Sequence, residues 1–141
     1  MTIAKALKEK NKLTTRLSKL WQKIYSHNSA IVGSEKPYDL DDVWAQIQDT
    51  MQKIVDLKTR IHNASSPVRD KIFLLSELKT HATHLSTINT TKGKTRSYGT
   101  EPDQIEAHFD IAWKDQQIEL TEAQIEATQE ELDRFNHTTL I

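Results

Sequence analysis

Apolar residues recur at alternating intervals of three and four along most of the chain, the spacing of a helix that packs along a seam. In residues 2–28 this row has two polar members, Lys10 and His27, and is widened by Leu7 and Trp21. The complete row is Ile3, Ala6, Lys10, Leu13, Leu17, Leu20, Ile24 and His27. The spacing predicts a first helix over residues 2–28.

Residues 40–62 and 67–88 repeat the same spacing and predict a second and a third helix. Asp39 stands directly before the second helix, where an aspartate caps the free backbone N–H groups of a first turn. Trp44 and Met51 widen the row of the second helix. The two rows are Leu40, Val43, Ile47, Thr50, Ile54, Leu57 and Ile61, and then Val68, Ile72, Leu75, Leu78, Ala82, Leu85 and Ile88.

The last segment, residues 102–136, predicts the longest helix, about 50 Å against about 40 Å for the first. Residues 89–100 contain two glycines and predict a mobile loop. No strand pattern competes with these helices. The sequence therefore predicts an all-α fold in one domain, residues 1–141. Its four helices would form an antiparallel bundle or long helical hairpins with coiled-coil-like packing.

Composition narrows the class of protein. A chain of 141 residues suits a single domain. The absence of cysteine excludes disulfides, cysteine-ligated zinc and thiol nucleophiles, and it fits a reducing cytosol, so we expect a cytoplasmic location. No apolar run is long enough for a membrane span or a signal peptide, so we expect no membrane partner.

Charge is unevenly distributed although the formal net charge is only −1. Residues 1–25 hold seven basic residues and one acidic residue, whereas residues 101–141 hold eleven acidic and two basic residues. In each segment six of these charges advance in steps of three and four, so each set of six forms a narrow stripe on its helix. The stripes are Lys5, Lys8, Lys12, Arg16, Lys19 and Lys23, and Asp115, Glu119, Glu122, Glu126, Glu130 and Asp133.

One antiparallel register matches all six charges of the two stripes. Lys5 pairs with Asp133, Lys12 pairs with Glu126, and in every pair the two position numbers sum to 138. We therefore expect the first and last helices to lie side by side as a charge ladder, within one chain or between two. Exposed ion pairs contribute only about 0–1 kcal/mol each, so the ladder selects partner and register more than it adds stability.

The last helix has apolar residues on both flanks of its acidic stripe. One flank is a heptad row and the other is a mixed set: Ile111, Ile118, Ile125 and Leu132, and then Ile105, Phe109, Trp113, Leu120, Ala123 and Ala127. Two apolar flanks indicate two neighbours, so the pattern predicts a homo-oligomer. The alternative is that both flanks serve the core of one monomer.

Candidate sites for chemistry are few. Glu77, His81 and His84 share one side of a helix at a spacing that suits a metal, but the sequence contains no Glu-x-x-His, and a solvated face explains them better. Neither phosphate-binding glycine loops nor a G-x-S-x-G motif occurs. We expect no catalytic residue, no metal and no cofactor.

Two polar clusters offer alternative functions. Lys92, Lys94, Arg96 and Tyr98 form a basic loop that suits contact with a nucleic-acid backbone, as in a defence or regulatory accessory protein. An up-down arrangement would bring a second set to one end of the bundle, either as an enzyme site or as helix caps. That polar pole comprises Arg60, Asn63, Arg69, Asp70, Asn136, Thr138 and Thr139.

Several short motifs, spread over nearly the whole chain, resemble one family. They are Ala4-Lys5-Ala6-Leu7, Gly33-Ser34-Glu35-Lys36-Pro37, Arg60-Ile61-His62-Asn63, Arg69-Asp70 and Asn136-His137-Thr138-Thr139-Leu140. In their order they are similar to the small bacterial proteins of the septicolysin, or DIP-type, family. The resemblance implies a helical, oligomeric, cytosolic protein with no established activity. The sequence thus favours a non-enzymatic, self-associating helical scaffold or interaction protein.

Overall fold

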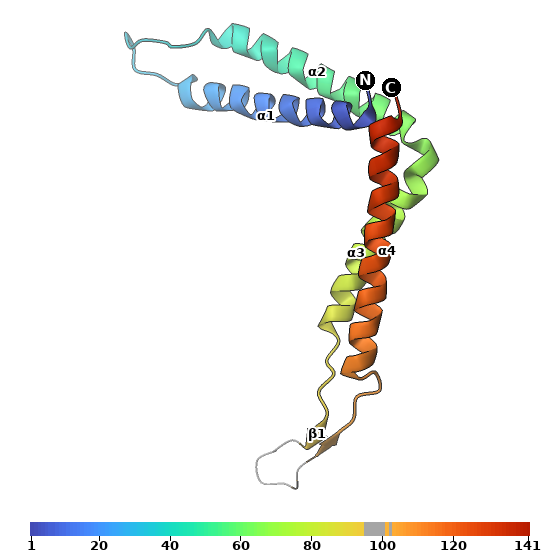
Figure 1. The fold of residues 1–141 in the computed structure, drawn as a ribbon. Coiled ribbons are helices and arrows are strands. Elements are labelled where there is room, and N and C mark those ends of the chain that lie inside the picture. The colour runs from blue at the N-terminus through green and yellow to red at the C-terminus, as the bar shows by residue number, and fades with distance from the viewer. Residues whose placement is uncertain (95–100, 102) are drawn as a thin grey trace. The chain divides into compact units, whose positions relative to one another are not determined.

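The computed structural model describes residues 1–94, 101 and 103–141, and within these residues it contains four α-helices (Figure 1). They are α1 (Ile3–His27), α2 (Leu40–Ala64), α3 (Arg69–Thr87) and α4 (Ile111–Thr138). The prediction of an all-α fold is confirmed. The chain divides into two compact units, which we describe separately: Met1–Pro67 with Asp133–Ile141, and Val68–Leu132.

The first unit is built on an antiparallel hairpin of α1 and α2. Its central cluster is formed by Leu20, Val43 and Ile47, all of which come from the predicted apolar rows. Leu17, Ile24 and Leu40 pack against this cluster, together with Trp21. Both helices begin and end within two residues of their predicted limits. The three-and-four spacing therefore identified the contact face of each helix correctly.

Side-chain caps fix where these helices begin. The Asp39 carboxylate accepts hydrogen bonds from the backbone N–H groups of Asp41 (3.0 Å) and Asp42 (3.3 Å), which confirms the predicted cap. Thr2 caps α1, because its hydroxyl oxygen accepts from the N–H of Lys5 at 3.2 Å. Each cap satisfies N–H groups that have no partner inside the helix.

The two ends of the chain pair with each other inside the first unit. The N–H of Ile3 donates to the carbonyl of Thr139, and the N–H of Ile141 donates to the carbonyl of Met1, both at 3.0 Å. Thr2 and Leu140 form the antiparallel bridge between these bonds. Ile3 is fully buried beside this pairing, so the start of α1 is held by packing as well as by hydrogen bonds.

The second unit contains α3 and most of α4, side by side and antiparallel. The Lys71 ammonium, near the start of α3, pairs with the Glu131 carboxylate late in α4. At the other end, the Lys114 ammonium donates to the carbonyl of Ile88 at 2.9 Å. In the connection, β1 (Gly93–Lys94) pairs antiparallel with β2 (Gln104–Ile105).

The predicted start of the last helix at residue 102 is wrong, because α4 begins at Ile111. The Asp110 carboxylate accepts from the N–H of Trp113 at 2.8 Å, and the Phe109 ring stacks on Trp113 with centroids 3.9 Å apart. This cap and the aromatic contact lie at the N-terminus of α4 and fix its first turn at Ile111. With 28 residues against 25, α4 is about 42 Å long and α1 about 38 Å, so most of the expected overhang disappears.

The core of the second unit differs in detail from the predicted rows. Leu75 and Leu85 of α3 are buried, whereas Ile72 and Ile111, both expected in a row, are largely exposed. On α4 the buried residues include Thr121 and Thr128. Their hydroxyls donate to the carbonyls of Gln117 and Gln124, both at 2.8 Å, so local hydrogen bonds satisfy the polar atoms and the methyl groups can be buried.

Candidate interaction surfaces

The α1–α2 hairpin carries exposed apolar residues beside its buried seam. On α2, Trp44, Met51 and Val55 are 49%, 46% and 50% exposed. Their spacing of seven and four residues places them on one side of the helix, about 100° from the buried row. Trp44 and Met51 were expected to widen the core, but this face leaves about half of each side chain open to solvent.

Aromatic contacts extend this surface from α2 to α1. The Trp21 ring meets Trp44 edge to face, with centroids 5.9 Å apart, and stacks on Tyr25 at 5.6 Å. Tyr25 is itself exposed. We call the five residues Trp21, Tyr25, Trp44, Met51 and Val55 the apolar face. It spans both helices of the hairpin.

A second surface, the basic strip, follows another side of α1. It comprises Lys5, Lys8, Lys12, Arg16, Lys19 and Lys23, and all except Lys23 are exposed. A shallow, open groove of about 650 Å³, lined by residues of α1 alone, runs beside Lys8, Lys12 and Lys19. A smaller depression of about 270 Å³ continues it to Lys5 and shares two of these lysines. The strip is thus a mainly cationic surface along α1, with the single acidic residue Glu9 beside Lys5, Lys8 and Lys12.

Among the described residues, the side chains of Arg16 and Lys23 in the basic strip have contacts inside the first unit. The Arg16 guanidinium donates to the side-chain oxygen of Gln46 at 3.3 Å, and the Lys23 ammonium lies 4.5 Å from the centre of the Tyr38 ring. Among the described residues, no carboxylate forms an ion pair with the ammonium groups of the other strip members, Lys5, Lys8, Lys12 and Lys19. Four positive charges therefore face solvent.

The acidic stripe lies on the exposed side of α4. Asp115, Glu119, Glu122, Glu126 and Glu130 belong to the second unit, and Asp133 belongs to the first. All six residues are exposed. Because all strip residues belong to the first unit and five of the acids to the second, the charge ladder stays a prediction.

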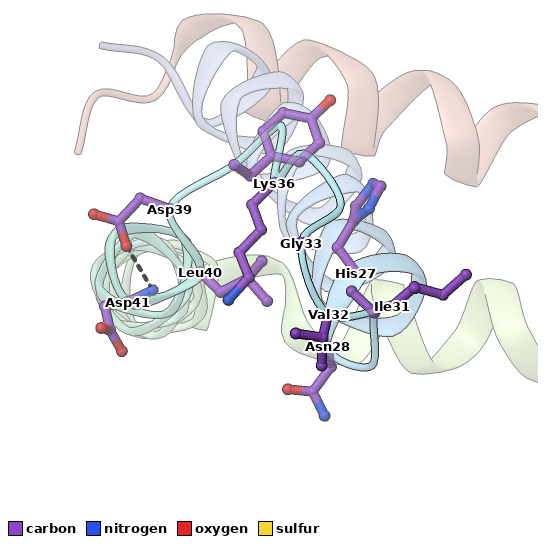
Figure 2. Close-up of a pocket in the computed structure, with 11 residues that line it drawn as sticks. His27, Asn28, Ile31, Val32, Gly33, Lys36, Asp39, Leu40 and Asp41 are labelled. Atoms are coloured by element: carbon purple, nitrogen blue, oxygen red, sulfur yellow. Dashed lines mark hydrogen bonds between the residues drawn. The ribbon is translucent and has the colours of Figure 1, made fainter.

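The loop between α1 and α2 encloses a pocket of about 510 Å³ that the sequence analysis did not single out (Figure 2). Among its lining residues are Lys36 and Asp39, together with His27, whose ring lies 5.4 Å from the Tyr38 ring. The carboxylate of Asp39 is engaged in capping α2, as the dashed bond to Asp41 in Figure 2 shows. The apolar rows predicted the helices on either side of this loop and gave no sign of a pocket.

The predicted polar pole is divided between the two units. Arg69 and Asp70 lie in the second unit, and the other five residues lie in the first. The Thr138 hydroxyl donates to the carbonyl of Arg134 at 2.8 Å, and the Thr139 carbonyl takes part in the terminal pairing. These bonds serve the end of α4. The gathering of the whole pole stays a prediction.

The remaining candidates lie on α3 and in the loop that follows it. Glu77, His81 and His84 are exposed, and they do not form a group that could hold a metal ion, nor do any other described residues. Lys92 and Lys94 are also exposed. The predicted partners of these lysines, Arg96 and Tyr98, lie outside the described residues.

Comparison with known proteins adds no functional assignment. No protein-family model, no curated protein and no solved structure matches the chain. In the part of the chain that the structure describes, no helix is both long and apolar enough to cross a membrane.

Proposed function

We propose that this protein is a non-enzymatic helical scaffold that self-associates through the apolar face of its α1–α2 hairpin. The observation that carries the proposal is the half-exposed row of Trp44, Met51 and Val55, which aromatic contacts connect to α1. Apolar side chains grouped on one exposed face favour an interaction site, because large exposed apolar patches mark such sites.

A second copy of the chain is the partner that best fits this face. Two helices lie side by side in the hairpin, so two copies facing each other across a two-fold axis would form a four-helix contact. Each copy would bury the same side chains, which favours association by about 25 cal/mol for every Å² of apolar surface removed from water.

The other expectations about the protein agree with this proposal. The septicolysin resemblance implies a helical and oligomeric protein. The cysteine-free composition supports a cytoplasmic location, which we propose for the scaffold. In this role the chain would present its loops and charged surfaces from a fixed assembly.

The test is the mass of the protein in solution when the apolar face is changed. We expect the wild type to exceed the chain mass of 16.2 kDa in light scattering after size exclusion. The double variant Met51→Glu/Val55→Glu should move toward that mass, because burial of two carboxylates is unfavourable.

The matched control places the same chemical change outside the face. Ile31 and Val32 are 84% and 100% exposed in the α1–α2 loop, so Ile31→Glu/Val32→Glu should keep the wild-type mass. Circular dichroism should show that both double variants keep their helices. A wild type that is monomeric at all concentrations contradicts the proposal, and so does an unchanged mass in Met51→Glu/Val55→Glu.

A further inference from the structure

We infer that the basic strip of α1 binds the acidic stripe of α4 from a second copy of this chain, in the antiparallel register in which paired position numbers sum to 138. This inference rests on the proposed self-association, and it identifies a second contact between copies. It concerns residues that the apolar face does not include.

In the part of the chain that the structure describes, the basic strip forms no ion pair inside its own unit, and the one carboxylate on α1 is that of Glu9. Lys8, Lys12 and Lys19 lie on one side of α1 beside a groove, with exposed ammonium groups and no ion pair among the described residues. Lys8 and Lys12 are four residues apart, a spacing at which like charges on a helix repel each other. A partner that supplies carboxylates along this groove would relieve that repulsion.

The acidic stripe has the geometry that such a partner needs. From Lys8 to Lys19 the strip advances by eleven residues, and from Glu119 to Glu130 the stripe also advances by eleven, about 16 Å along each helix axis. In an antiparallel alignment Lys8 meets Glu130 and Lys19 meets Glu119. The steps between these positions are mirrored, so all charges coincide in one register.

Each copy carries both halves of the contact, which is why a second copy is the fitting occupant. When the strip of one copy binds the stripe of its partner, the two-fold operation creates the reverse pairing as well. A polyanion such as a nucleic acid would also neutralise the strip. It carries no counterpart to the mirrored carboxylates Glu119, Glu122, Glu126 and Glu130 of α4, so charge complementarity favours the second copy.

The inferred contact does not compete with the apolar face. On α1 the basic strip lies about 120° to one side of the buried row, whereas Trp21 and Tyr25 lie on the other side, at 100° per residue. The hairpin can therefore engage one partner through each side. Changes in the two surfaces should be separable by experiment.

The decisive experiment mixes two charge-reversed chains. One chain carries Lys8→Glu, Lys12→Glu and Lys19→Glu, and the other carries the reversals at the paired positions of α4, Glu119→Lys, Glu126→Lys and Glu130→Lys. Each chain alone places like charges at three of the six pairs in every contact between its copies. In the mixture both contacts of the two-fold pair are again opposite in sign.

We expect each reversed chain alone to associate at least about tenfold more weakly than the wild type in 50 mM NaCl, and the equimolar mixture to recover the wild-type affinity within about threefold. Sedimentation and fluorescence transfer between labelled chains measure both quantities. Raising the salt to 500 mM should weaken the recovered contact, because exposed charges are then screened. The control Lys36→Glu/Lys79→Glu/Lys92→Glu, with the same change in net charge, should associate like the wild type.

Three results would overturn the inference, and each differs from a failure of the proposed function. Wild-type affinity in both reversed chains would remove the charge contact while leaving the apolar contact intact. Recovery only when all six reversals stand in one chain would place the ladder within a single molecule. Loss of binding to a 20-nucleotide single strand in the α1-reversed chain, without recovery in the mixture, would make the strip a polyanion site. A monomeric wild type, in contrast, would refute the scaffold proposal itself.

Discussion

Substitution of Ile47 by alanine tests the central packing of the α1–α2 hairpin. Ile47 is 1% exposed and lies in the cluster with Leu20 and Val43, where both helices contribute side chains. The substitution removes three carbon atoms from a site without solvent. At about 0.8 kcal/mol for each buried methylene, the transfer free energy alone amounts to about 2.4 kcal/mol.

The cavity left behind increases this loss. Because helix–helix packing relaxes only in part, we expect the free energy of unfolding to fall by about 3 kcal/mol in total, within the range for isoleucine-to-alanine changes in protein cores. For a chain of this length that corresponds to a decrease in Tm of about 10 °C. Helix content should be unchanged at low temperature.

Circular dichroism at 222 nm, followed during heating and during urea titration, measures this loss. The protein concentration should be the same for every variant, because self-association adds to apparent stability. Ile31→Ala is the matched control, since it removes the same atoms from a side chain exposed in the loop, and it should change the free energy by less than about 0.5 kcal/mol. A loss below about 1 kcal/mol for Ile47→Ala, or one equal to that of Ile31→Ala, would refute the assignment of this cluster as the core.

Two further predictions concern the start of α4 and whether the two compact units unfold in one transition. Asp110→Ala removes the cap of α4 and should lower the free energy of unfolding by about 1 kcal/mol in urea titrations. Asp110→Asn should retain most of this free energy. Equal losses of stability in both variants would argue against the cap. If residues 1–141 fold as one domain, Ile47→Ala and Leu85→Ala should shift the same single calorimetric transition, although they lie in different compact units. Two transitions, each moved by one substitution, would show that the units unfold independently.

The sequence was most informative where one helix face meets one partner. The rows in residues 2–28 and 40–62 contained every member of the central cluster, because burial along a helix seam imposes a periodicity that the residue types record. The capping role of Asp39 could be predicted equally well, because a side chain that accepts hydrogen bonds from the first turn of a helix must stand directly before that turn. Local chemistry and regular spacing were sufficient for these features.

Prediction of the buried residues was weaker where a residue of polar type lies in a buried environment. Thr50 belongs to the predicted row of the second helix and is buried, whereas the predicted rows of the last helix contain no threonine. There Thr121 and Thr128 complete a three-and-four row with Ile118, Ile125 and Leu132. Their hydroxyls bond to carbonyls of the preceding turn, so a residue that looks polar in the sequence acts as a small apolar group in the contact.

Ile47 and Trp44 show why the interaction surface could not be read from the same pattern. Both are apolar, they stand three residues apart on α2, and the sequence placed both toward the core. Their exposed fractions are 1% and 49%, because α1 offers contact along one narrow seam only. Periodicity reports that a side chain prefers burial, whereas the number of neighbours decides whether one chain can provide it. Half-exposed residues beside a filled seam are therefore the natural place to seek a second copy.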